Sequence, residues 1–174
     1  MSIMNIEYNE LMVNDIESRR AFLFTLEWLL ALMKRYSSPL QFGLVHIEYG
    51  SNHELGETLG VHEVFKQLAS LTASLTSAFR KTDIVGRDVT DFWVIVPYTA
   101  ENEKLHDKIF SVLQDAKHKG LNVVDREISI FSLPLVLTAT EAQDAPVEAL
   151  KFLEYLKNNK QHFASHVFRL SATQ

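Results

Sequence analysis

A chain of 174 residues with 47% hydrophobic residues is long enough for one domain with a sizeable core. The formal net charge of −5 disfavours proteins that bind nucleic acids or anionic membranes through a basic face, although it leaves room for a small basic nucleotide site. The absence of cysteine excludes disulfides and thiolate chemistry, and no apolar run approaches the roughly 20 residues of a membrane span. We therefore expect a cytoplasmic protein without nucleic-acid or membrane partners.

The first predicted element is a long helix that is apolar on several sides. Asn14 or Asp15 is its predicted N-cap, and it runs to about Tyr36. Residues 1–13 have no firm periodicity and form either an arm or an extension of this helix, while residues 14–174 form a single domain. Apolar surface beyond one helical stripe is more typical of a core or a dimer contact than of a cofactor site.

Apolar periodicity predicts the remaining elements. In chain order they are a strand at residues 40–49, a polar loop at 50–60, a helix at 61–79, a hairpin with its turn at 88–91, a helix at 101–119, a strand at 127–138, a helix to about 159 and a strand at 166–170. Pro146 is predicted to lie in the first turn of the last helix. This order predicts a single α/β domain with an antiparallel hairpin in its sheet.

The most informative stretch of the sequence runs from Arg80 to Pro97. Its second strand is apolar almost without a break from Phe92 to Val96, and it stops at Pro97 because proline cannot continue a central ladder. The turn before this strand contains no glycine, although glycine is the usual residue of tight hairpin turns. The pattern predicts a charged helix end, a short strand, a tight turn and a buried strand.

This stretch resembles the signature of GGDEF domains, the diguanylate cyclase family. Arg80-x-x-Asp83 and Arg87 stand at the family's spacing, and Phe92 with the apolar strand that follows it also matches. The resemblance extends over nearly the whole chain. It implies an α/β (α+β) fold of the palm type found in nucleotidyl cyclases, with a central, mostly antiparallel sheet of about five strands flanked by helices.

The same resemblance identifies departures at the family's active-site positions. Val89-Thr90-Asp91 replaces the Gly-Gly-Asp/Glu-Glu motif and is one residue short, His46 stands where a magnesium-binding Asp is usual, and His62 replaces a guanine-binding Asp. Imidazole is a poor ligand for Mg²⁺, and β-branched side chains fill the space of a triphosphate. Each lost charge clamp typically lowers the rate by ~10²–10³. We expect a degenerate GGDEF domain with no catalytic residues, no bound metal, no cofactor and no cyclase activity.

The Arg80-x-x-Asp83 pair has a different implication. In the family this pair grips a guanine and a phosphate of cyclic di-GMP at an inhibitory site, and the planar guanidinium fork suits both groups. The resemblance therefore implies a cyclic di-GMP site at Arg80, Asp83 and Arg87. The alternative is that Arg80 and Asp83 form a pair that merely caps the hairpin, and that Arg87 is structural.

Three functions remain open from the sequence. The first is a silent signalling domain that binds cyclic di-GMP at Arg80 and Asp83. The second is a protein-interaction or homodimerisation module without a nucleotide, which the apolar excess of the first helix favours. The third and least favoured is a residual enzyme with unusual metal ligands such as His46 and Asp91.

Overall fold

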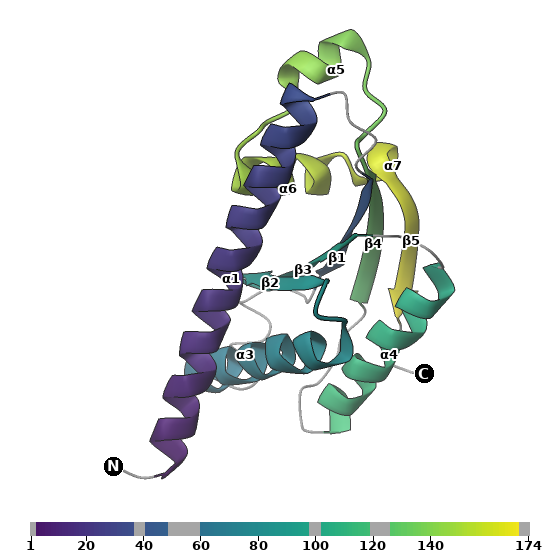
Figure 1. Cartoon of the computed structure of the whole chain (residues 1–174). Coiled ribbons are helices and arrows are strands. Elements are labelled where there is room, and N and C mark those ends of the chain that lie inside the picture. The colour runs from purple at the N-terminus through teal and green to yellow at the C-terminus, as the bar shows by residue number, and fades with distance from the viewer. Residues whose placement is uncertain (1–2, 37–40, 49–59, 98–101, 119–125, 171–174) are drawn as a thin grey trace.

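The computed structural model of the chain describes residues 3–36, 41–48, 60–97, 102–118 and 126–170 (Figure 1). The elements in order are α1 (Ile3–Arg35), β1 (Phe42–Glu48), α3 (Val61–Ala78), β2 (Ile84–Asp88), β3 (Asp91–Val96), α4 (Asn102–His118), β4 (Arg126–Leu133), α5 (Ala139–Asp144), α6 (Ala149–Asn158), α7 (Lys160–Phe163) and β5 (Ala164–Leu170). Nearly all of the polar loop predicted at residues 50–60 lies outside the described residues. None of the described helices combines the length and apolar character that crossing a bilayer requires.

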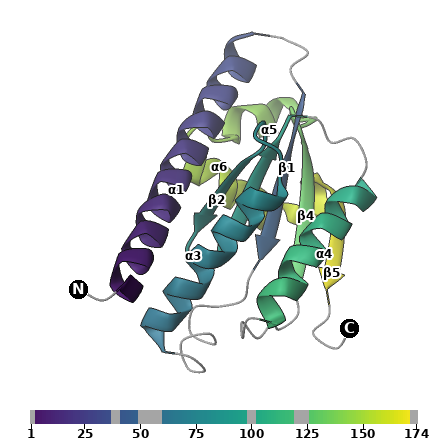
Figure 2. The ribbon, with the colours of Figure 1, turned by 60° about the horizontal axis from the view of Figure 1, so that its bottom comes forward.

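The five strands form one sheet in the order β2-β3-β1-β4-β5, and each neighbouring pair is antiparallel. Helices α3 and α4 pack on one face of this sheet, and α1 and α6 pack on the other (Figures 1 and 2). This arrangement confirms the predicted fold class, a palm-like α/β domain with a five-stranded antiparallel sheet and flanking helices.

Strand β3 is apolar without a break from Phe92 to Val96 because both of its faces are covered. Successive side chains of a strand point to opposite faces, so each strand contributes to two cores. The α3–α4 side holds Val45, Ile47, Leu68, Leu75, Phe92, Val94, Ile109 and Ile130, and the α1–α6 side holds Phe22, Leu26, Leu44, Trp93, Ile95, Phe131 and Phe152. The central strands β1 and β4 also carry two buried polar residues, His46 and Ser129.

Helix α1 begins at Ile3, so the predicted N-caps Asn14 and Asp15 are wrong. Both residues lie inside the helix, and residues 3–13 continue it without interruption. Asp15 is buried and forms an ion pair with Arg87 of β2. An Asp that pairs across the fold cannot be told from a capping Asp by local sequence, because short polar side chains serve both roles.

The segment between β4 and α6 also differs from the prediction. Strand β4 ends at Leu133, and Thr138 instead caps the short helix α5 in a capping box with Glu141. Pro146 precedes Glu148, the N-cap of α6, and therefore lies outside the first helical turn where it was predicted. Two short helices, α5 and α7, were not predicted, because neither is long enough to display a helical period.

Gly86 allows α1 to lie directly on β2. A Cβ atom at this position would lie 2.5 Å from the Cβ atom of Phe22, which is closer than two non-bonded carbon atoms can approach. The close approach fixes the helix against the hairpin strand. As a consequence, α1 places Asp15 beside Arg87 and Arg19 beside Asp88.

Candidate functional site

The β2–β3 hairpin turns through Val89 and Thr90, between the paired residues Asp88 and Asp91. Val89 has a φ of 58°, and it alone among the described non-glycine residues has a positive φ. This left-handed conformation costs a β-branched residue about 1–2 kcal/mol. The Val89 carbonyl accepts a hydrogen bond from the Arg87 guanidinium at 2.5 Å, which helps to hold the turn in this shape.

Strands β1 and β3 bring together two of the residues predicted from the family resemblance, His46 and Asp91. The Nε2 atom of His46 lies 2.7 Å from Oδ1 of Asp91, and the Nζ atom of Lys157 donates to Oδ2 of the same carboxylate at 2.6 Å. Lys157 projects from α6, which covers this face of the sheet. Both carboxylate oxygens of Asp91 are therefore occupied by donors from the chain itself.

The protonation states follow from burial and from these hydrogen bonds. His46 is fully buried and stacks on Trp93 with 4.2 Å between the ring centroids. Burial lowers the pKa of His46, and this outweighs the opposing influence of Asp91. Burial opposes ionisation of Asp91, but the hydrogen bonds from His46 and Lys157 outweigh it and lower the pKa of Asp91. A neutral imidazole thus donates its Nε2 proton to an ionised carboxylate, which can only accept.

The other ring nitrogen of His46 has no hydrogen-bond partner among the described residues. Nδ1 is buried, and so is the hydroxyl of Ser129, which lies opposite His46 on β4 and is likewise unpartnered in the described part of the chain. Side chains at directly paired positions of an antiparallel sheet lie on the same face. His46 Nδ1 and the Ser129 hydroxyl are therefore two buried polar groups on the same face of the sheet, and neither has a hydrogen-bond partner among the described residues.

A row of three carboxylates crosses the end of the sheet at this point. Asp91, Glu48 and Glu127 occupy paired positions on β3, β1 and β4. Lys160 Nζ lies 2.7 Å from Glu127 and 3.5 Å from Glu48, and Arg169 lies 3.4 Å from Glu127. The hydrogen bond from Lys160 lowers the pKa of Glu127. Ammonium and guanidinium groups of the chain thus neutralise the acids that could otherwise attract a divalent cation.

Sequence reasoning missed Glu127 and Lys160 as members of this cluster. Their pairing depends on the register of β4 against β1 and on the short helix α7, and neither is visible in local sequence. Across the described residues, no group of three or more His, Asp or Glu side chains is arranged to hold a metal ion.

Arg87, predicted as a ligand or structural arginine, is buried in a network that joins three elements. Its Nη2 and Nε atoms donate to the two carboxylate oxygens of Asp15 at 2.6 and 3.2 Å, and Thr72 of α3 donates to Asp15 at 2.9 Å. This geometry favours the structural interpretation, while a contact with a ligand stays a prediction. His62, the other predicted position, is exposed in the first turn of α3, on the opposite face of the sheet from His46.

Arg80 and Asp83 form the tight turn between α3 and β2. The Arg80 backbone N–H donates to Oδ2 of Asp83 at 3.0 Å, and the Asp83 N–H donates to the Arg80 carbonyl at 2.9 Å. The pair thus shapes the turn through the Arg80 backbone and the Asp83 carboxylate, and no ion pair between the two side chains is found among the described residues. The Arg80 side chain is exposed, and within the described part of the chain no hydrogen bond or ion pair engages its guanidinium.

No protein-family model and no curated protein matches the sequence. Among solved structures, the chain is similar to the GGDEF domain of PA1120 (YfiN or TpbB) from Pseudomonas aeruginosa, with a TM-score of 0.52 and 17% identity over 85% of this chain and 92% of that chain. It is also similar to a microbial GGDEF domain described by its interaction with bis-(3,5)-cyclic di-GMP, with a TM-score of 0.51 and 15% identity over 81% and 87%. The chain has a GGDEF-domain fold.

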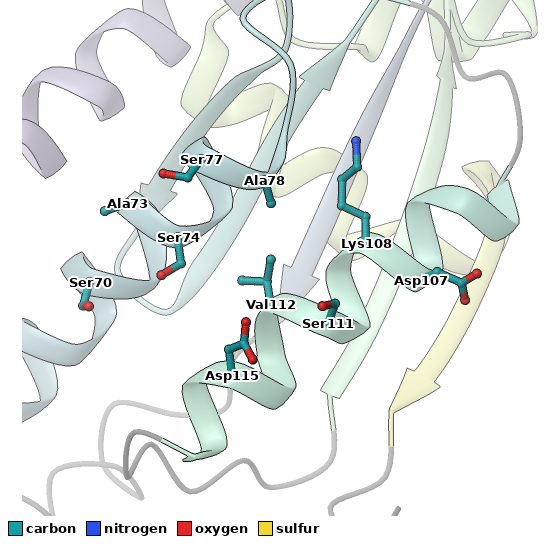
Figure 3. A pocket seen from close by; sticks show the side chains of 10 residues that line it. All are labelled: Ser70, Ala73, Ser74, Ser77, Ala78, Asp107, Lys108, Ser111, Val112 and Asp115. Atoms are coloured by element: carbon teal, nitrogen blue, oxygen red, sulfur yellow. The ribbon is translucent and has the colours of Figure 1, made fainter.

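A groove that is separate from the residues above lies among the described residues of this GGDEF fold (Figure 3). The groove has a volume of about 780 Å³ and lies between α3 and α4. Small side chains of α3 line one wall, and Asp107, Lys108 and Asp115 of α4 stand on the other. None of the residues predicted from the GGDEF resemblance lines it, so the groove and the predicted sites are distinct features of the fold.

Proposed function

We propose that this chain is a catalytically silent signalling domain that recognises cyclic di-GMP through Arg80 and Asp83. One contrast supports the proposal. Both oxygens of Asp91, at the end of the sheet, are engaged by His46 and Lys157, whereas the guanidinium of Arg80 is exposed and unengaged within the described residues. A catalytic Mg²⁺ needs carboxylate oxygens that are free to coordinate it. A guanine or phosphate group needs a guanidinium that is free to donate hydrogen bonds to it.

The silent part of the proposal follows from the requirements of magnesium. Mg²⁺ takes oxygen ligands in octahedral geometry, usually carboxylates, waters and substrate phosphates. To bind at Asp91 it would have to displace the ammonium of Lys157, and the neighbouring His46 offers no oxygen. The side chain of Val89 is half-exposed at the turn, where the family's glycines leave the backbone open to phosphate.

The receptor part of the proposal follows from the chemistry of the turn. A guanidinium can donate two parallel hydrogen bonds to guanine O6 and N7 or to a phosphate, and its flat face can stack on a base. A carboxylate can accept from the N1 and N2 donors of guanine. Asp83 is held in place by the Arg80 backbone through Oδ2, and Oδ1 has no hydrogen-bond partner among the described residues, so the acceptor is pre-positioned.

The test of the receptor part is calorimetric titration of the full chain with cyclic di-GMP. Binding is expected for the natural chain and is expected to disappear in Arg80→Ala. Arg80→Lys is expected to weaken binding because it keeps the charge but loses the fork, whereas the neighbouring variant Lys81→Ala is expected to bind normally. The absence of heat at saturating ligand, or an equal loss in Arg80→Ala and Lys81→Ala, would reject the receptor role.

The silent part has an independent test. Incubation of the chain with GTP and either Mg²⁺ or Mn²⁺ is expected to give no cyclic di-GMP. If product forms and is lost in Asp91→Ala, the chain is a residual cyclase and the silent assignment is wrong.

A further inference from the structure

The outer side of α1 carries an exposed row of residues with coiled-coil spacing. Every member of the row is exposed, including Phe24 at 75% and Trp28 at 56%. The row, called the outer seam below, consists of Glu17, Ala21, Phe24, Trp28, Ala31 and Arg35. Steps alternating between four and three residues keep side chains on one side of a helix, as in a two-stranded coiled coil.

The outer seam points away from the domain. The opposite side of α1 packs into the core through Phe22 and Leu26, and both ribbon views place α1 at the rim of the molecule (Figures 1 and 2). Two large aromatic side chains on one exposed helix face are more than the scattered single apolar residues that a monomer normally shows. The outer seam is therefore expected to bind a partner that buries these aromatic side chains.

The order of residues along the outer seam makes it complementary to itself when reversed. From one end to the other, the row is acid, small, aromatic, aromatic, small and base. If a second copy of α1 lies alongside in the opposite direction, Phe24 meets Trp28 of the second copy and Ala21 meets Ala31. At the two ends, Glu17 meets Arg35 of the second copy.

We propose that the outer seam is a homodimer interface in which two copies of α1 pack antiparallel. A closed twofold dimer uses the same patch on both subunits, and this arrangement satisfies that requirement. Aromatic pairs fill the centre of the interface, and the alanines beside them let the helices approach closely. The interface lies outside the Arg80–Asp83 turn, so the proposal does not depend on the function proposed above.

Charge decides the direction of packing. In a parallel pair, Glu17 would lie beside Glu17 of the second copy and Arg35 beside Arg35, which places like charges together at both ends. The antiparallel pair replaces both repulsions by attractions, as complementary charges do when they set the orientation of coiled coils. On one flank of the outer seam, Glu27 turns toward α6, where its carboxylate accepts from the Ala149 N–H at 3.2 Å.

The first test is sedimentation velocity of the full chain over a dilution series. The natural chain is expected to form a dimer whose population rises with concentration. Trp28→Glu is expected to raise the dissociation constant of the dimer by at least about tenfold. The reason is that an aromatic side chain buried at the centre of an interface typically contributes more binding free energy than a tenfold change represents. Ile16→Glu is the matched control, an exposed apolar residue of the same helix that lies off the outer seam. A natural chain that stays monomeric at every concentration, or equal weakening by both variants, would overturn the proposal.

The second test determines the direction of packing by cross-linking. The chain has no cysteine, so Ala21→Cys and Ala31→Cys each introduce a single thiol. In the antiparallel register residue 21 faces residue 31 of the second copy, and equal positions lie about 15 Å apart, beyond the roughly 7 Å limit for a disulfide. Only the mixture of the two variants is expected to give a covalent dimer. Efficient cross-linking of either variant with itself would exclude the antiparallel arrangement.

Discussion

The two ends of strand β2 carry the same kinds of charged residue in opposite surroundings. Before the strand starts, Arg80 and Asp83 lie in an exposed turn, and the Arg80 guanidinium is unengaged in the described part of the chain. At its other end, Arg87 is buried against Asp15, and Asp88 accepts from Arg19 at 3.1 Å. Asp15 and Arg19 of α1 pair with the charged residues at the second end, whereas Arg80, before the first end, is exposed.

The difference teaches that a sequence motif does not fix the role of its arginines. A guanidinium that is covered must be paired, because an uncompensated buried charge is strongly unfavourable. A guanidinium that is uncovered gains little from a surface pair and remains available for a ligand. In this chain coverage by α1 and α3, not spacing along the strand, separates the two roles.

The largest effect is expected from exchanging each arginine for methionine. Arg87→Met leaves Asp15 buried without its cation and is expected to lower the free energy of unfolding by about 3–5 kcal/mol. Arg80→Met is expected to change it by less than about 0.5 kcal/mol, because the side chain is exposed. Urea unfolding monitored by circular dichroism measures both values. The comparison fails if the two variants lose the same stability, and the double variant Asp15→Leu/Arg87→Met should recover much of the loss.

A second test addresses the closed end of the sheet through pH. The pKa of buried His46 is lowered from its ordinary value of 6.5, so acid protonates this histidine in the unfolded chain while it stays neutral in the folded one. Stability is therefore expected to fall as the pH drops below about 6.5, by up to about 1.4 kcal/mol per pH unit for one proton. The lowered pKa of Asp91 adds a second loss below its ordinary value of 3.8.

Urea unfolding at a series of pH values measures this dependence. His46→Gln keeps an N–H donor for Asp91 but cannot titrate, so it is expected to flatten the profile between pH 6.5 and the acid loss that Asp91 contributes. An unchanged profile in this variant would mean that His46 does not set the acid sensitivity, and the assignment of a neutral, buried imidazole would be wrong.

The smallest effect is expected at the hairpin turn. Val89→Asn is expected to raise the free energy of unfolding by about 1 kcal/mol, because Asn adopts the left-handed conformation more readily and the half-exposed Val89 side chain contributes little packing. Thr90→Asn serves as the control and is expected to have little effect, since Val89 is the described residue with the positive φ. Equal gains from both substitutions would show that φ at Val89 is not the cause.

The fold could be predicted from the sequence because its main elements display clear periods. The helix at α3 and the continuous apolar strand β3 agree with prediction to within about a residue at each boundary. The family resemblance also placed His46 and Asp91 at one site, and their side chains do meet. The degenerate state of the motif and the absence of catalysis stay predictions.

The remainder could not be predicted because it depends on contacts between distant residues. Asp15 resembles a cap until Arg87 is placed opposite it, a pairing across 72 positions of the chain. The Glu127–Lys160 pair requires a strand register and a four-residue helix. Likewise, nothing near Arg80 and Arg87 in the sequence distinguishes the exposed arginine from the buried one.

The contact at Gly86 has a mechanical consequence. Because Phe22 occupies the space that a Cβ atom of Gly86 would need, the long helix and the hairpin strand pack closely at this point. A fragment that lacked α1 would not fold as a smaller domain, since it would expose to solvent the apolar face of the sheet that holds Trp93 and Ile95. A displacement of α1 would therefore be transmitted to the β2–β3 hairpin through the contact between Phe22 and Gly86.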